Sequence, residues 1–176
     1  MHSIHYSVIT TKEGRAVKKI SKDDKGELVI DGAPEISAGT IEHKEATLTD
    51  FAKELNNLTS KQCFTFGVMR DSVPGQVDRL ITMAKEANAE EGRSRSRKNM
   101  VWPTTHFLFI DVDAKDKITG TNLEEAWSRV CEVLPELQEA TYVAVSSSSS
   151  HLYEKGTDTV LRPAGSYHCL IPCTGD

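Results

Sequence analysis

Long apolar runs are missing from this 176-residue chain. No segment approaches the ~18 consecutive apolar residues that a membrane-spanning helix requires. Residues 1–6 lack the basic and then apolar layout of a signal peptide. These absences predict a soluble, cytoplasmic protein with no membrane partner.

Cysteine is also scarce, with four scattered residues: Cys63, Cys131, Cys169 and Cys173. Cys169 and Cys173 form the only close pair, and no second pair exists to complete a tetrahedral zinc site. We therefore expect reduced, buried thiols.

Several catalytic motifs are absent as well. The chain has no Gly-x-Ser-x-Gly elbow, no glycine-rich phosphate loop ending in Lys-Ser/Thr, and no dinucleotide-binding fingerprint. A serine or cysteine hydrolase is therefore set aside, and any ATPase function must belong to another domain.

Positive charge is in the minority, because 21 Lys and Arg face 26 Asp and Glu, giving a net charge of -5. This balance argues against a protein that coats nucleic acid nonspecifically. It leaves room for one local basic strip, which is present as Arg93, Arg95, Arg97 and Lys98.

What the chain does contain is an alternation of strand-like and helix-like segments. Residues 1–45 hold short apolar stretches, and the turn at residues 23–26 predicts a small β-hairpin. Beyond them we expect helices at 49–58, 74–84 and 121–134, and strands at 63–68, 106–113, 141–147 and 167–172, with a long hairpin at 146–166. The predicted class is α/β (α+β), with a central mixed sheet flanked by helices. The expected domains are an N-terminal β-rich segment, 1–45, and a core, 46–176.

Two carboxylates follow the apolar run 106–110, which we expect to be a central strand buried on both faces. Asp111 and Asp113 point to the same face, because side chains alternate along a strand. Such a pair repels itself unless a cation neutralises it. Oxygen ligands suit Mg²⁺ or Mn²⁺, and two such ions can activate a 3′-hydroxyl and stabilise a leaving pyrophosphate. The alternative is a solvated strand end leading into the polar turn at 114–117.

A second pattern lies at the start of the strand at 167–172. Ser166 and His168 are two residues apart and share one face of that strand. A hydroxyl and an imidazole can bind triphosphate oxygens together, with Arg162 available as a charged clamp. The alternative is a hydrogen-bonded histidine at the start of a strand.

In combination, these two patterns resemble the archaeo-eukaryotic primase superfamily, towards its phage and plasmid primase-polymerases. The family pattern is an apolar strand with Asp-x-Asp/Glu, then Ser-x-His on a later strand, then a third Asp. The first two elements occur here in order, about 55 residues apart, and the basic strip precedes them. The resemblance spans roughly residues 90–172.

The resemblance implies a primase-polymerase (palm) core with nucleotidyltransferase activity in DNA replication. Asp111 and Asp113 would hold Mg²⁺ or Mn²⁺, and His168 with Ser166 would contact the phosphates of an incoming NTP or dNTP, aided by Arg162. The basic strip would meet the phosphates of a single-stranded DNA template. A helicase domain or partner would belong to the full-length protein.

Two alternatives remain open, and one departure from the family bears on them. The third carboxylate of the family lies beyond Ser-x-His, whereas this sequence stops at Asp176, so we expect an N-terminal piece of a longer replication protein whose own activity stays open. A non-catalytic replication-origin binding or interaction module with a primase-like fold is one alternative. A metal-dependent nuclease or initiator is the other, although the chain has no His-x-His pair.

Overall fold

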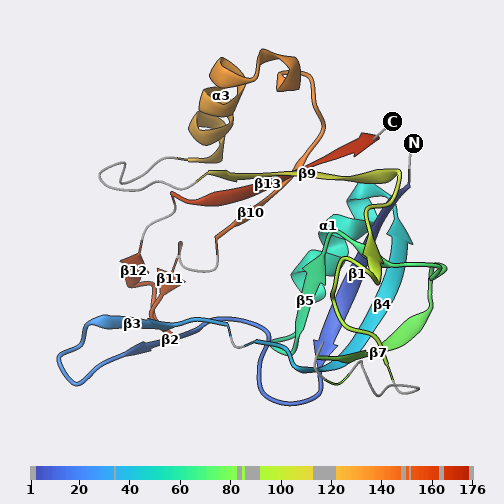
Figure 1. Cartoon of the computed structure of the whole chain (residues 1–176). Coiled ribbons are helices and arrows are strands. Elements are labelled where there is room, and N and C mark those ends of the chain that lie inside the picture. The colour runs from blue at the N-terminus through green and yellow to red at the C-terminus, as the bar shows by residue number, and fades with distance from the viewer. Residues whose placement is uncertain are drawn as a thin grey trace. The chain divides into compact units, whose positions relative to one another are not determined.

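The computed structural model describes residues 3–33, 35–82, 85, 92–112, 122–147, 150, 152–162 and 165–174. Its elements are mostly strands, with helices between them (Figure 1). In chain order they are β1 Ile4–Thr11, β2 Lys19–Lys22, β3 Leu28–Asp31, β4 Ala38–Ala46, α1 Leu48–Asn57, β5 Gln62–Thr65, β6 Val68–Met69, β7 Val77–Ile81, β8 Met100–Val101, β9 Thr105–Val112, α3 Leu123–Val133, the 3-10 helix η1 Pro135–Leu137, β10 Val143–Ser146, β11 Leu152–Tyr153, β12 Val160–Arg162 and β13 Tyr167–Thr174. The mixed helix and strand class expected from the sequence is confirmed. The strands form several small sheets in place of one central mixed sheet, and β1 with β4, β4 with β7, and β10 with β13 pair antiparallel.

The chain divides into two compact units at places other than residue 45. The first unit contains residues 1–107 and 173–176, and the second contains residues 108–172. β1 and β4, from the expected N-terminal segment, pair with β5 and β7, from the expected core. The N-terminal strands are therefore an integral part of the first unit.

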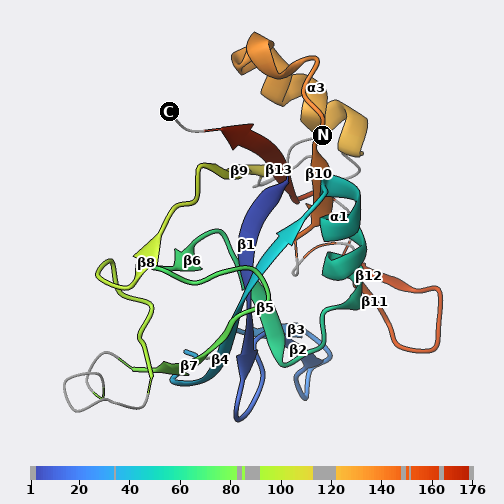
Figure 2. The ribbon, with the colours of Figure 1, turned by 90° about the vertical axis from the view of Figure 1, so that its right-hand side faces the viewer.

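A four-stranded sheet organises the first unit in the order β5-β1-β4-β7 (Figure 2). Along β1 the even-numbered side chains face α1, where Phe51 packs edge-on against Tyr6 with ring centroids 4.7 Å apart. The odd-numbered side chains face the other way, where Ile9 and Ile41 join Met69 and Leu80 in a buried cluster. Apolar residues on both faces explain why this strand is the core of its unit.

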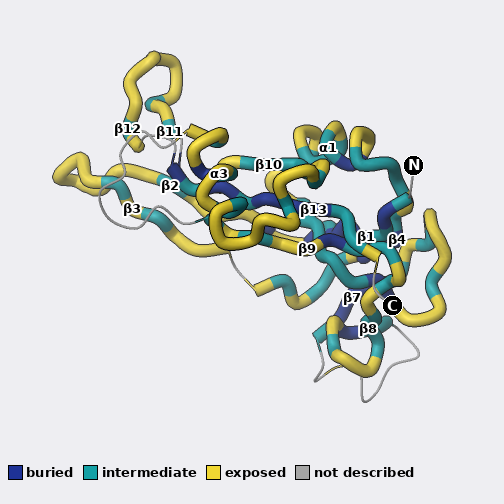
Figure 3. The backbone as a smooth tube through the Cα atoms, turned by 90° about the horizontal axis from the view of Figure 1, so that it is seen from above, coloured by how far each residue is buried: buried dark blue, intermediate teal, exposed yellow. Residues whose placement is uncertain are grey.

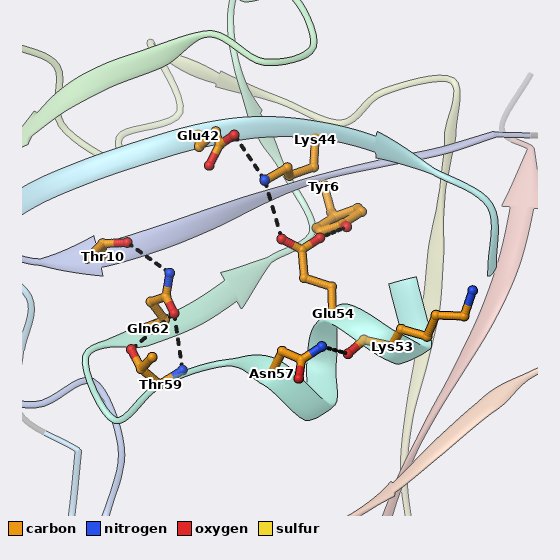
Figure 4. Close-up of polar contacts among 9 residues, drawn as sticks. All are labelled: Tyr6, Thr10, Glu42, Lys44, Lys53, Glu54, Asn57, Thr59 and Gln62. Carbon is orange, nitrogen blue, oxygen red and sulfur yellow. Dashed lines mark hydrogen bonds and ion pairs between the residues drawn. The ribbon is translucent and has the colours of Figure 1, made fainter. Parts of the chain in front are cut away.

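The helix α1 is fixed at its start and along its packed face. Thr47 is the N-cap, and its hydroxyl accepts a hydrogen bond from the backbone N–H of Asp50. Further along, Glu54 accepts a hydrogen bond from the Tyr6 hydroxyl and pairs with Lys44 at 3.4 Å (Figure 4). Burial and the Glu54 carboxylate raise the pKa of Tyr6 well above its usual range, so the phenol stays a donor.

The helix expected at 74–84 is wrong over the described part of that range, because β7 occupies Val77–Ile81. The backbone N–H of Gln76 donates to the carbonyl of Val73 at 2.9 Å, and Gly75 has φ of 84°. With Pro74 in the second position, this is a type II turn, which needs a glycine in the third. The turn starts a strand that pairs with β4, although the apolar spacing also fits a helix.

Two other expectations in the first unit have different outcomes. The hairpin expected around residues 23–26 is confirmed, since β2 and β3 pair across a turn closed by Gly26 N–H and the Asp23 carbonyl. The strand expected at 63–68 is broken into β5 and β6 at residues 66–67. A Cβ at Gly67 would lie 3.1 Å from Met100 and 3.3 Å from the Val101 carbonyl oxygen, so this point is closely approached by β8.

The second unit is built on a three-stranded sheet in the order β10-β13-β9. The strands expected at 106–113, 141–147 and 167–172 therefore lie in one sheet, as predicted. The helix α3 lies on one side of these strands in Figure 1, and Ala126 packs with Tyr167 and Cys169. The N-cap of α3 is Asn122, whose side chain accepts a hydrogen bond from the backbone N–H of Glu125.

β9 differs from the expected central strand buried on both faces. It lies at the edge of the described sheet, and Leu108 and Phe109 are exposed (Figure 3). Other side chains of this strand are covered. Phe107 is buried in the first unit, and Ile110 packs against the cluster that contains Ala126 of α3. A continuous apolar run does not by itself fix how many faces a strand buries.

The described cysteines are free thiols, and Cys169 alone among them is buried. Cys63, Cys131 and Cys173 are half-buried, so the expectation of buried thiols holds for one of the four. Burial raises the pKa of Cys169, which makes this thiol unreactive at neutral pH.

Candidate functional site

The structure brings two of the predicted site residues together. Asp111 near the end of β9 and His168 near the start of β13 lie on one face of the second unit, with His168 Nε2 3.5 Å from Asp111 Oδ1. Both side chains remain accessible, with relative exposures of 33% for His168 and 56% for Asp111. They come from segments 57 positions apart in the chain, so the sheet itself creates the pair.

Strand alternation explains why these groups share a face. On β9 the even-numbered Ile110 and Val112 pack towards α3, which turns Asp111 to the other side. On β13 the odd-numbered Tyr167 and Cys169 pack towards α3, which turns His168 the same way as Asp111. The helix therefore covers one face of the sheet and leaves the carboxylate and imidazole on the other.

The surroundings of His168 hold its ring in place. Phe109 lies against the imidazole with ring centroids 5.1 Å apart. On the opposite side, Val145 of β10 is the direct cross-strand partner of His168. An aromatic ring and a branched side chain on either side restrict the imidazole, so that its Nε2 edge stays beside Asp111.

The start of β13 is held by hydrogen bonds from the serine run. The carbonyl of Ser166 accepts hydrogen bonds from Ser147 N–H at 2.9 Å and from Ser150 Oγ at 3.1 Å. Ser150 is buried at 8% exposure. These serines anchor the backbone two residues before His168, which is a positioning role.

The other predicted residues have mixed outcomes. Ser166 is half-buried immediately before β13, and Arg162 is exposed at the end of β12, opposite Leu152. Asp113 and Asp176 lie outside the described residues.

The residues of the predicted basic strip lie in the first unit, and they do not all have the same role. The Arg93 guanidinium donates to the carbonyl of Arg70 at 2.7 Å, and its backbone bridges to β7. Arg93 is therefore part of the framework. Arg95, Arg97 and Lys98 are exposed on the turn that follows.

A divalent cation fits this face in part. Asp111 offers accessible carboxylate oxygens, which suit Mg²⁺ or Mn²⁺, and an imidazole nitrogen stands beside them. Within the described ranges, no group of three or more His, Cys, Asp or Glu side chains is placed to hold a metal ion. The second predicted ligand, Asp113, is outside those ranges.

Sequence reasoning missed Phe109, which shares a face with Asp111 by the same two-residue alternation and packs on His168. It was hidden because the apolar run 106–110 was interpreted as buried throughout.

No protein-family model, curated protein or solved structure matches this chain. Across the part of the chain that the structure describes, no helix has the length and apolar character needed to span a bilayer.

Proposed function

We propose that the open face of the second unit is the nucleotide-binding part of a DNA primase-polymerase, which transfers a nucleotide from an NTP or dNTP to a growing strand on a single-stranded DNA template. One observation supports this most strongly. Asp111 and His168, predicted from separate motifs, lie 3.5 Å apart on a face that α3 leaves uncovered.

The proposed role of each residue follows from its chemistry. The Asp111 carboxylate, together with Asp113, would hold a divalent cation, which when bound would neutralise phosphate charge and lower the barrier to attack by a hydroxyl. His168 would bind a phosphate oxygen through Nε2. In the tautomer that carries its proton on Nε2, the imidazole is a hydrogen-bond donor to such an oxygen.

Phe109 and Val145 would contribute by keeping the imidazole oriented, since they flank His168 on the two neighbouring strands. A donor that is already oriented loses little conformational freedom when a ligand binds. The hydrogen bonds from Ser150 and Ser147 to the Ser166 carbonyl would fix the position of the backbone that carries His168.

The first test is nucleotide binding in the presence of Mn²⁺, measured by fluorescence titration with a labelled nucleotide. His168→Ala removes a hydrogen bond to a charged group, which is worth roughly 1.5–3 kcal/mol, so affinity should fall about tenfold or more. Asp111→Asn should weaken the Mn²⁺-dependent part of binding. Asp158→Asn is the matched control, because it removes the same charge from an exposed position between β11 and β12.

Primer synthesis on single-stranded DNA is the second test, carried out on the same variants. A parent protein extended at its C-terminus should make primers that depend on Mn²⁺ or Mg²⁺, and Asp111→Asn should abolish them. If His168→Ala binds nucleotide as tightly as the parent and as Asp158→Asn, the site assignment fails. A non-catalytic binding module then becomes the better interpretation.

A further inference from the structure

The sheet of the first unit has one face that α1 covers only at one end. Tyr6 and Lys44 are direct cross-strand partners at that end, and both contact Glu54 of α1. Further along the same face the partners become polar, and a row of directly paired positions crosses all four strands: Gln62, Thr10, Thr40 and Arg79. Figure 4 shows Thr10 with Gln62 beyond the reach of the Glu54 contacts.

This uncovered end forms a pocket. Its volume is about 790 Å³, and its walls come from the ends of β1, β4 and β7. Three of the lining residues are cationic, namely Lys12, Arg79 and Lys85. Within the described part of the chain the lining includes no Asp or Glu.

The remaining polar lining consists of hydroxyl groups, on Thr10, Thr11, Thr40 and Ser37. Hydroxyls and cationic side chains are donors to anionic oxygens. The charged side chains among the described lining residues are all positive, whereas the chain as a whole has a net charge of -5. The local excess of positive charge therefore selects for anions.

The layout favours an anion with several charged groups over a single one. Lys12 continues β1, and Arg79 is on β7, two strands away. Neighbouring strands are about 4.8 Å apart, so these two residues are set roughly 10 Å from one another across the sheet. A guanidinium matches the oxygens of a phosphate in pairs, and lysine supplies a point charge to the same kind of group.

We infer that this pocket is a binding site for a chain of linked phosphates, such as a free oligophosphate or the triphosphate of a nucleotide. The pocket belongs wholly to the first unit, whereas Asp111 and His168 belong to the second. The inference therefore goes beyond the proposed function and does not rest on it.

The experiment is isothermal titration of the whole chain with tripolyphosphate, and separately with ATP, at low salt with EDTA present. EDTA removes divalent cations, so metal-dependent binding at Asp111 does not contribute. The double variant Lys12→Gln, Arg79→Gln should bind at least tenfold more weakly than the parent. The control Lys19→Gln, Lys25→Gln removes the same charge from exposed positions at the β2–β3 hairpin and should stay within about twofold.

Each outcome decides the matter. Equal affinity for tripolyphosphate and ATP supports a bare phosphate chain as the ligand. Tighter binding of ATP identifies a nucleotide as the ligand. Absence of binding by both, or an equal loss in the control double variant, overturns the inference. Binding of a single-stranded oligonucleotide alone would also overturn it, in favour of nucleic acid. The double variant Lys12→Gln, Arg79→Gln should keep the Mn²⁺-dependent part of nucleotide binding that Asp111→Asn weakens, which separates a failure of this pocket from a failure of the proposed nucleotidyl-transfer site.

Discussion

His43 is a buried histidine, at 6% exposure, and it has polar neighbours on both ring nitrogens. Its Nδ1 is 3.2 Å from the carbonyl of Ser72, and its Nε2 is 3.1 Å from Nδ1 of His5. Ser7 is its direct cross-strand partner, and the Glu45 charge favours the protonated form. Burial has the largest effect and lowers the pKa of His43 below its usual value of 6.5.

A lowered pKa makes the first unit sensitive to acid. Because the unfolded chain takes up the His43 proton at a higher pH than the folded chain, stability is greatest above pH 6.5 and falls as the pH drops below it. We expect thermal melting of the parent to move to lower temperature between pH 7.5 and pH 5.5. The variant His43→Gln cannot take up this proton. It should be less stable than the parent at pH 7.5, but its melting temperature should fall less than that of the parent when the pH is lowered.

His106→Gln is the control for this prediction, since it leaves His43 and its partners in place. It should show the same acid-induced fall as the parent. A fall of equal size in His43→Gln would mean that other groups cause the acid sensitivity.

For single residues, the two-residue alternation of strands was enough to predict that Asp111 shares a face with Asp113 and that His168 shares a face with Ser166. It was not enough to predict Phe109 against His168, because that contact depends on which strands become neighbours. Arg93 shows the same limit in the basic strip. Its charge suggested a ligand contact, whereas its guanidinium is used on the Arg70 carbonyl.

Among the elements, α1 depends most clearly on one side chain. Phe51 is fully buried and meets Tyr6, Phe64 and Phe107 at ring-centroid distances of 4.7, 5.6 and 4.5 Å. Replacing it with alanine removes these ring contacts and leaves a cavity, because the surrounding structure relaxes only in part. We expect Phe51→Ala to cost about 3–5 kcal/mol of unfolding free energy, measured by urea denaturation.

Lys53→Ala tests whether the loss comes from packing rather than from helix propensity. Lys53 lies on the exposed side of α1 and pairs with Asp50 at 2.8 Å. Its removal should change stability by no more than ~0.5 kcal/mol. Comparable losses in the two variants would contradict the assigned role of Phe51.

The elements also show where sequence patterns are ambiguous. The strands that carry Asp111 and His168 were predicted because their apolar runs are short and are followed by polar turns. The segment from Pro74 was predicted as a helix because Val77, Leu80 and Ile81 fit a 3.6-residue period. Five residues are too few to separate the two periods, and the Pro74-Gly75 turn was the local evidence that decided for a strand.

The charge of the whole molecule shapes how it would meet DNA. With a net charge of -5, long-range attraction to a polyanion is absent, so binding must depend on local contacts. Arg95, Arg97 and Lys98 are the exposed members of the basic strip. We expect replacement of all three by alanine to weaken binding of single-stranded DNA and to reduce the slope of log affinity against log salt by about 2, at ~0.7 per phosphate contact.

The measurement is fluorescence anisotropy with a labelled oligonucleotide at several salt concentrations. A triple variant of Lys18, Lys19 and Lys25 removes the same charge from another exposed part of the first unit. Its slope should stay close to that of the parent. Equal effects in the two triple variants would show that total charge, rather than this turn, governs the binding.

The edge position of β9 has a consequence for self-association. Among the described strands, β9 ends its sheet, and it shows Leu108 and Phe109 to solvent. An edge of this kind is a template on which a strand of another molecule can add, and a charged side chain opposes that addition. We therefore expect the Asp111 carboxylate to oppose such addition, apart from its proposed chemistry. Selection against aggregation would favour a carboxylate at this position even in a descendant that no longer carried out the reaction.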